Sequence, residues 1–562
     1  MKKKICKHLI FCLSLISLIL TGCSDKPIPY DTAEARLLKL TDKVSWQENY
    51  ATKMAMIEEG SPADLASTLP PIDNFKLTVD SRVSAGDAGA EIFSSTEKSG
   101  AGTDSWLVQV AEDFNKRRIK LSSGKTAKIR VRQIASGTGC EFIISRKYIP
   151  EAFSPSNHLW IKMVQASGIR VEAITERMVG NVAGIVMKNS IHSLLEKEYG
   201  TVTVENIIDA VIQGTIAMGY TNPFASSTGL NLLQTVLVTA ARGDQKKMLE
   251  PAAVDTFEAF QRGVPFVALT TLQMRESVEK DRSLGAFVME YQTFANTQGL
   301  KSGYRFIPFG SRHDNPLYAL GDINSEKRET LERFADFASQ PSAQKLADRY
   351  GFNKLSEYRP SFDHADGEVL LQAQKLWKEK KDSGFPVLAV FLGDVSGSMR
   401  GLRIKMLREA LIEGCNFISP ENYIGLAVFE RTVSKILPVR KFDIRHKSMF
   451  ISAVESLQAT GSATAMYDGI TVALEMLLEA KRQIPDGKPI LFVLTDGETN
   501  SGFEFSQVRK VFEGLLIPIY TISYGESIGE LRQVSSLNEA ASLKADETDI
   551  KYQIGALLNA EM

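Results

Sequence analysis

Short apolar runs that end in small hydroxyl residues recur along the chain from residue 90 onward. One such run, AEIFSSTEKSG, precedes the amphipathic stretch SWLVQVAEDFNKR. The stretches TAKIRVRQIASGTG, EAFSPSNHLW and TIAMGYTNPFASSTGLNLL repeat the arrangement. Runs of strand length that alternate with segments of helical period are typical of α/β domains. We therefore predict an α/β domain over residues 90–360.

A second α/β pattern follows a polar passage that ends near residue 382. The apolar runs VLAVFLG, YIGLAVFE, PILFVLT and LIPIYTISYG predict buried strands, and RIKMLREALIEGCNFI and ITVALEMLLEAKRQI predict helices. Continuous apolar strands that alternate with helices favour a parallel sheet covered on both faces. Residues 383–562 are therefore expected to form a separate α/β domain.

The N-terminus has the pattern of an export signal. A basic segment, MKKKICKH, precedes an apolar run from Leu9 to Leu20. This run is shorter than the ~20 apolar residues of a membrane-spanning helix and fits a cleaved signal. The next residues, LTGC, resemble a bacterial lipobox, which implies that residues 1–22 are removed and that Cys23 is lipidated. We expect an exported protein, anchored by lipid to the bacterial cell membrane or envelope and facing away from the cytoplasm.

Residues 23–89 combine a tether, SDKPIPYD, with helical pieces such as TAEARLLKL and with loops rich in Pro, Gly, Ser and Asp. This composition predicts a tether and a helical stalk.

Composition excludes several classes of function. The 66 Lys and Arg residues nearly balance the 67 Asp and Glu residues, so the net charge gives no indication of nucleic-acid binding. Outside the signal and the lipobox, Cys140 and Cys415 are expected to be free thiols, and the six histidines form no zinc motif. KLSSGKT lacks the first glycine of a P-loop, and VSGSM is not a nucleophile elbow. We expect no enzymatic activity.

Five oxygen-bearing side chains lie just beyond the apolar runs of the C-terminal region. Asp394, Ser396 and Ser398 follow the first run, Asp496 follows PILFVLT, and Thr464 precedes a predicted helix. The alternating positions in DVSGSM let three of these side chains face one point. This set has no base to activate a serine, but it suits a hard cation, because Mg²⁺ prefers oxygen ligands and few carboxylates. The pattern predicts a site for Mg²⁺ or for another divalent cation such as Mn²⁺ or Ca²⁺.

DVSGSM, the threonine loop GSATAMYDG and LTDGETN together resemble the von Willebrand factor A (VWA) domain and its metal-ion-dependent adhesion site, over about residues 383–562. The resemblance implies a doubly wound, Rossmann-like fold and a metal that reserves one coordination position for a carboxylate of a protein partner. Many members have two glycines before the threonine, and this sequence departs from that pattern at Thr464. A metal that only braces the loops is the alternative.

FSSTEKSG, ASGTG, SPSNHLW and GYTNPFASSTGLN, followed by the stretch from DNPLYAL to YGFN, resemble in order the blocks of the bacterial extracellular solute-binding proteins, over about residues 88–355. The resemblance implies two hinged lobes that close on a small ligand, often an anion. Hydroxyls at strand ends suit this role, although each taken alone also suits a helix cap. The matching positions are Ser95, Thr96, Ser136, Thr138, Ser156, Ser227 and Thr228.

Two functions follow from these patterns. The first is a membrane-anchored surface lipoprotein that binds an acidic residue of a protein partner through Mg²⁺, and a small ligand or second partner through the solute-binding-like domain. The second is a substrate-binding lipoprotein of an ABC-type uptake system for a small solute such as an anion. The added C-terminal domain favours the first.

Overall fold

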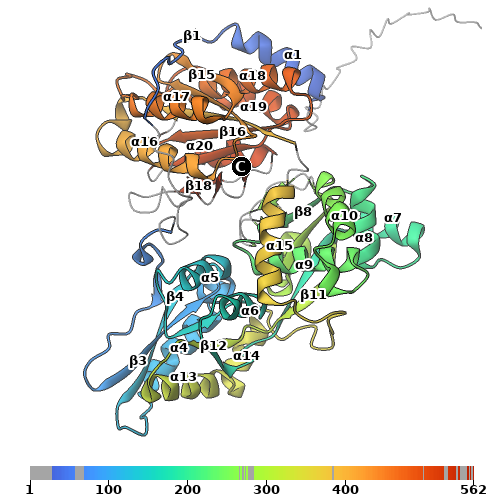
Figure 1. The fold of residues 1–562 in the computed structure, drawn as a ribbon, viewed down its shortest axis with the longest axis vertical. Helices are drawn as coiled ribbons and strands as arrows, with labels where there is room; N and C mark the ends of the chain where they lie inside the picture. Colours follow the sequence, from blue (N-terminus) through green and yellow to red (C-terminus); the bar gives the residue numbers. More distant parts are fainter. Residues whose placement is uncertain are drawn as a thin grey trace, which may run out of the picture.

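Three β-sheets, each flanked by helices, organise the computed structural model (Figure 1). The structure describes residues 28–56, 69–264, 266–268, 271, 274–275, 284–381, 385–497, 499–524, 529–538, 542–544, 554–555, 557–558 and 561–562. The expected signal over residues 1–22 and the expected lipidation site, Cys23, lie outside this part of the chain. Within it, no helix combines the length and the apolar composition that a membrane span requires. The predicted α/β architecture, with a two-lobed region followed by a doubly wound domain, is confirmed.

Lobe 1 is built on a six-stranded sheet with the order β2-β4-β3-β5-β12-β6. β3 pairs in parallel with β4 and β5, so the hydroxyl residues that end or follow these three strands lie at one sheet edge. The strands are β2 (Leu77–Val79), β3 (Asp87–Ser94), β4 (Thr126–Gln133), β5 (Ala152–Ser154), β6 (Val171–Thr175) and β12 (Leu317–Leu320). The helices are α3 (Thr96–Ser99), α4 (Trp106–Arg117), α5 (Ser136–Ile144), α6 (Leu159–Ala166), α13 (Ser325–Ala338) and α14 (Pro341–Arg349).

Lobe 2 is built on a five-stranded sheet with the order β11-β7-β10-β8-β9. The chain enters this lobe between β6 and β7 and returns to lobe 1 between β11 and β12, so two crossovers join the lobes. The strands are β7 (Asn181–Lys188), β8 (Met218–Thr221), β9 (Phe266–Ala268), β10 (Ala286–Glu290) and β11 (Tyr304–His313). The helices are α7 (Asn189–Tyr199), α8 (Val204–Ile212), α9 (Ser227–Ala240), α10 (Pro251–Arg262) and α12 (Tyr291–Asn296).

Helix α15 (Gly367–Lys380) extends the packed two-lobed region beyond the expected boundary at residue 360. It packs against α6 of lobe 1 and α9 of lobe 2. Gly367 lies against the backbone of α6, and the indole Nε1 of Trp377 donates to the hydroxyl of Tyr220 at 2.5 Å. The stretch that the sequence presents as a polar linker is therefore part of the fold, because one face of it is apolar.

The C-terminal domain contains a seven-stranded sheet with the order β1-β15-β14-β13-β16-β17-β18. Alternate residues of the central strand β13 belong to two hydrophobic clusters, one on each face of the sheet. This double burial explains the continuous apolar run in the sequence. The later strands are β13 (Val387–Asp394), β14 (Tyr423–Phe429), β15 (Val433–Lys441), β16 (Lys488–Thr495), β17 (Ile519–Ser523) and β18 (Ser542–Lys544). The helices are α16 (Leu402–Gly414), α17 (Ile444–Glu455), α18 (Met466–Gln483), α19 (Phe505–Gly514) and α20 (Gly529–Ser535).

The N-terminal segment differs from the stalk expected over residues 23–89. Helix α1 (Tyr30–Thr41) packs against α18 and α19, and β1 (Trp46–Glu48) adds a parallel strand to β15 (Figure 1). The N–H groups of Asn49 and Ala51 continue this edge by donating to backbone carbonyls of β15, each at 2.9 Å. Residues 30–51 therefore belong to the C-terminal domain, and the two-lobed region is inserted between β1 and β13. A helix with a narrow apolar stripe gives no sequence signal for the partner that will cover it.

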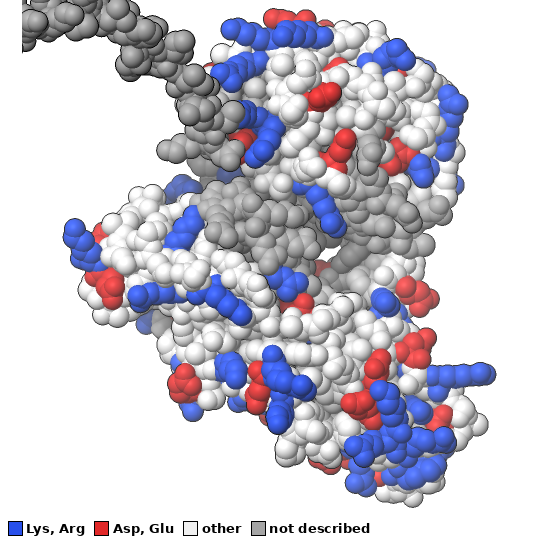
Figure 2. Space-filling model, turned by 180° about the vertical axis from the view of Figure 1, so that it is seen from behind, with Lys and Arg blue, Asp and Glu red and all other residues white. Residues whose placement is uncertain are grey.

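The near-neutral total charge conceals an uneven distribution. Figure 2 shows Lys and Arg gathered at the end of lobe 1 that lies away from the C-terminal domain. The end of α4 and the connection to β4 carry exposed Lys116, Arg117, Arg118 and Lys120.

Candidate metal centre and ligand cleft

The two predicted aspartates lie at one edge of the C-terminal sheet. Asp394 is the last residue of β13, and Asp496 directly follows β16. β13 and β16 are parallel neighbours, with Gly393 opposite Leu494, so their carboxyl ends coincide. The loop after β13 carries Ser396 at the start of a short 3-10 turn. The sheet topology thus brings together residues that are about one hundred positions apart.

Hydrogen bonds join four of the five predicted ligands into one network. The Ser396 N–H donates to Asp394 Oδ1 at 2.7 Å, and the hydroxyls of Ser396 and Ser398 are 3.0 Å apart. The Ser398 hydroxyl donates to Asp496 Oδ1 at 2.8 Å. On the other side, the Thr495 hydroxyl donates to Asp394 Oδ2 at 2.5 Å. The carboxylates and serine hydroxyls therefore face a common position.

Thr464 lies on a third loop that approaches the same turn. The Gly461 N–H of that loop donates to the carbonyl of Val395 at 3.1 Å, and a Cβ added to Gly397 would lie 3.0 Å from the Gly461 carbonyl. Thr464 is buried, and its N–H donates to Asn500 Oδ1 at 2.9 Å. Among the described contacts, none joins its hydroxyl to the other four predicted ligands. Thr464 is thus held next to the network but not within it.

The electrostatics of this edge favour a cation. Asp394 is fully buried, and burial raises the pKa of its carboxyl above the usual range, with the charge of Asp496 acting in the same direction. Asp496 is also buried and accepts a short hydrogen bond from Arg403 Nη1 on α16. A divalent ion would offset the cost of burying two carboxylates. The all-oxygen donor set, with only two carboxylates, fits the coordination that Mg²⁺ prefers.

The predicted ligand-binding residues are distributed along the facing edges of lobes 1 and 2. The Ser156 N–H donates to the Ser136 hydroxyl at 3.3 Å within lobe 1, and the hydroxyls of Thr228 and Thr271 are 3.4 Å apart in lobe 2. Ser227 accepts a hydrogen bond from the Trp160 indole at 2.8 Å across the lobes. Ser95 is buried directly after β3, Thr138 is buried in the first turn of α5, and Thr96 is half-buried at the start of α3. The structure therefore brings these residues to one junction, where their hydrogen bonds form separate groups and not one connected network.

The two lobes touch at this junction. The Gly137 N–H donates to the Ala225 carbonyl at 3.1 Å, and the Asn157 side chain donates to the Ser227 carbonyl at 3.2 Å. A Cβ added to Gly137 would lie 1.8 Å from the carbonyl oxygen of Phe224, so only glycine permits this approach. The lobes are therefore closed against each other at the helix N-termini.

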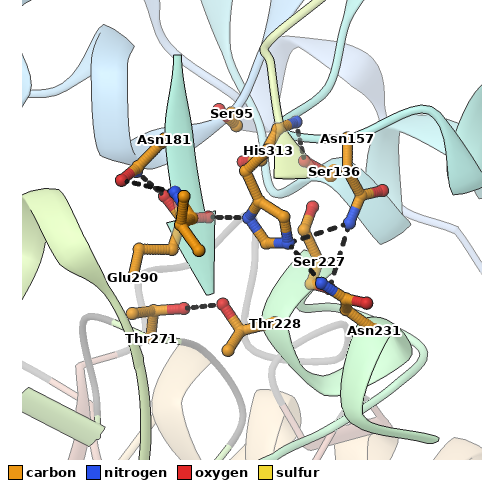
Figure 3. Close-up of polar contacts among 12 residues, drawn as sticks. Ser95, Ser136, Asn157, Asn181, Ser227, Thr228, Asn231, Thr271, Glu290 and His313 are labelled. Atoms are coloured by element: carbon orange, nitrogen blue, oxygen red, sulfur yellow. Dashed lines mark hydrogen bonds and ion pairs between the residues drawn. The ribbon is translucent and has the colours of Figure 1, made fainter. Parts of the chain in front are cut away.

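A buried histidine links the two lobes at the crossover strands. His313 Nδ1 lies 2.7 Å from Glu290 Oε1, and its Nε2 lies 3.1 and 3.2 Å from the amide nitrogens of Asn157 and Asn231 (Figure 3). The backbone of Ser311 fixes the Asn231 amide, because it accepts from Nδ2 and donates to Oδ1, each at 2.8 Å. Nε2 must therefore accept, and the proton lies on Nδ1, directed at Glu290.

Charged side chains also occupy the junction, where the sequence predicts hydroxyls only. Lys98 is completely buried and donates to the Ser95 hydroxyl at 2.7 Å and to the Ser154 carbonyl at 2.8 Å. Burial lowers the pKa of Lys98. Burial, followed by the charge of Glu290 in lobe 2, raises the pKa of Glu97. The predicted set of hydroxyl residues is therefore incomplete, because acidic groups from both lobes also meet there.

Sequence reasoning missed the residues that connect the predicted ones. Asn157, Asn231, Glu290 and His313 form the interlobe network, and Arg403 contacts the metal-site aspartate. Asn157 lies within the motif SPSNHLW, and Arg403 follows the motif DVSGSM closely. Their closeness in sequence to predicted ligands could have indicated that they belong to the two sites. His313 and Glu290 lie at strand ends in stretches that carry no local signal.

Comparisons with known proteins agree with this architecture. The family model of the bacterial extracellular solute-binding protein matches residues 99–353, and that of the von Willebrand factor type A domain matches residues 389–498. The inter-alpha-trypsin inhibitor heavy chain H3 of Mus musculus is 27% identical over 161 residues, which cover 26% of this chain and 17% of that protein. Heavy chain H1 of Homo sapiens is 26% identical over 147 residues, covering 25% and 16%. The chain thus spans less than a fifth of the length of these curated relatives.

Among solved structures, the sulfate-binding protein SubI from Mycobacterium tuberculosis H37Rv is similar at 14% identity and a TM-score of 0.34, covering 51% of this chain and 91% of that one. The von Willebrand factor type A protein from Catenulispora acidiphila is similar at 17% identity and a TM-score of 0.27, covering 31% and 42%. By the two family matches, the chain combines a region of the bacterial extracellular solute-binding protein family with a von Willebrand factor type A domain.

Proposed function

We propose that this protein is a membrane-anchored surface lipoprotein whose VWA domain binds an acidic residue of a protein partner through Mg²⁺. The observation that supports this most directly is the network of Asp394, Ser396, Ser398 and Asp496 at one sheet edge. Asp394, Ser396 and Ser398 would hold the ion, and Asp496 and Thr464 would complete its shell from separate loops. The ion would supply an electrophilic position at which a partner's carboxylate replaces water.

The protein residues have separable tasks at this site. The Ser396 N–H and the Thr495 hydroxyl fix both oxygens of Asp394, so the carboxylate is oriented before the ion arrives. Ser398 is exposed, while Asp394 is fully buried, so the site is open to solvent at Ser398. A partner would therefore approach over Ser398.

The test is a Mg²⁺ titration of the purified full-length chain, read out by its melting temperature. The wild type should gain stability with Mg²⁺ and lose it with a chelator, because binding to the folded state alone stabilises it. Asp394→Ala should not respond. Asp486→Ala is the matched control, because Asp486 is exposed in the loop that precedes β16, away from the metal edge. Equal responses of the wild type and Asp394→Ala would refute the proposal.

The solute-binding-like region is proposed to close on a small ligand or a second partner at the lobe junction. The hydroxyls of Ser94, Ser154 and Ser156 are buried there and make no hydrogen bond within the described part of the chain, so they are available to a ligand. Native mass spectrometry should show a bound small molecule that Gly137→Ala loses, because the added methyl group prevents lobe contact. Gly86→Ala, which has open space around its Cβ, should retain it.

A further inference from the structure

The side chain that reaches into the metal edge from outside the predicted set is Arg403. It lies in the first turn of α16, and its Nη1 donates a short hydrogen bond to Asp496 Oδ2. The same nitrogen lies 3.3 Å from the carbonyl oxygen of Ser398. The side chain of Arg403 is 47% exposed, whereas that of Asp496 is 1% exposed. The long Arg403 side chain thus extends from solvent to the buried carboxylate of Asp496.

We propose that Arg403 competes with the divalent ion for Asp496 and thereby sets the metal concentration at which the VWA site fills. This inference rests on the proposed metal-dependent function. Both oxygens of Asp496 are engaged, Oδ1 by the Ser398 hydroxyl and Oδ2 by Arg403. A divalent ion that is attracted by Asp496 must either share this carboxylate with the Arg403 guanidinium or displace the guanidinium from it.

The guanidinium cannot relieve this conflict by losing its proton, because arginine stays charged in proteins. Two cations a few ångströms apart repel each other strongly at a partly buried site. Because Arg403 is half-exposed, its side chain can avoid this repulsion by rotating into water. Filling of the site is therefore coupled to release of Arg403 from Asp496.

Two other roles for Arg403 give different outcomes. An arginine that orients Asp496 for the metal would support binding, so its removal would weaken Mg²⁺ affinity. An arginine that acts only by its positive charge would be equivalent to any neighbouring cation. Arg400 is such a neighbour, because its Nε donates to the Ala459 carbonyl at 3.2 Å in the threonine loop and it makes no described contact with Asp496.

The experiment is isothermal titration of Mg²⁺ into the full-length wild type, Arg403→Gln, Arg403→Lys and Arg400→Gln. Arg403→Gln should bind Mg²⁺ about fivefold more tightly than the wild type, the size expected for loss of one half-exposed ion pair. Arg403→Lys should give a smaller gain because it keeps a charge but loses the planar fork. Arg400→Gln should stay within about twofold of the wild type.

The outcomes separate this inference from the proposed function. Mg²⁺ binding by the wild type that is lost in Asp394→Ala, together with unchanged or weaker binding by Arg403→Gln, would overturn the inference alone. An equal gain in Arg400→Gln and Arg403→Gln would also overturn it, since the effect would then be one of net charge. An absence of Mg²⁺ binding in both the wild type and Arg403→Gln would overturn both, whereas binding by Arg403→Gln alone would support strong competition.

Discussion

Replacing Leu37 with alanine tests whether the N-terminal helix is a structural part of the VWA domain. Leu37 on α1 is completely buried, in the hydrophobic cluster that includes Val508, Val511 and Phe512. Its neighbour Leu38 is 39% exposed and provides a matched control with the same side chain. If α1 were part of a free stalk, Leu37→Ala and Leu38→Ala would have the same effect on stability. If α1 is docked on the domain, Leu37→Ala should be the more destabilising of the two.

The magnitude follows from burial. Truncating a fully buried leucine to alanine costs about 2–5 kcal/mol, with the lower values at sites that can relax. Helix α1 covers the domain from outside and can settle into the space left behind, so we expect about 2–3 kcal/mol. For a domain of roughly 150–250 residues, 1 kcal/mol corresponds to about 2–4 °C in Tm, which predicts a loss of about 4–12 °C. Leu38→Ala should change Tm by less than about 2 °C.

The assay combines thermal unfolding with hydrogen exchange measured by mass spectrometry, because a chain with several domains does not unfold in one step. Exchange should increase in peptides from α18 and α19, the helices that contact α1, and not in lobes 1 and 2. Identical melting and exchange for Leu37→Ala and Leu38→Ala would refute the assignment of residues 30–51 to the C-terminal domain.

Three further predictions concern buried polar and titratable groups. Glu290→Gln should lower the free energy of unfolding by about 1–3 kcal/mol, because it turns an amide N–H₂ toward a donor in the His313 network; unaltered urea denaturation would contradict this. Burial lowers the pKa of His364 to about 4, so the unfolded chain takes up a proton first and stability should fall as the pH falls from about 6.5 to 4; His364→Gln should show a shallower fall in pH-dependent melting curves. Cys140 and Cys415 are free and buried, and burial raises the pKa of both thiols, so a thiol reagent such as Ellman's should label these two residues only after denaturation; rapid labelling of either of them in the native chain would disprove their burial.

Local patterns were sufficient for the α/β alternation of the two regions, but not for the places of α1, β1 and α15 in the fold. Continuous apolar runs predicted the central strands of the VWA sheet, because a strand buried on both faces has no polar positions. The position of acids and hydroxyls after these runs predicted the metal edge, since parallel strands end on the same side of a sheet. Asp394 and Asp496 met as expected for that reason.

The sequence alone determined the fold class, the core of the two regions and the strand ends at which Asp394 and Asp496 lie, because these depend on periodicity and on where apolar runs stop. Only the tertiary structure decided that α1 and β1 complete the C-terminal sheet, that His313 connects the lobes, and that Arg403 pairs with Asp496. Each of these contacts joins segments whose mutual position depends on how whole elements pack. A local pattern shows that a face is apolar or that a side chain is charged, but the partner of that face or charge is set by the packing of distant elements.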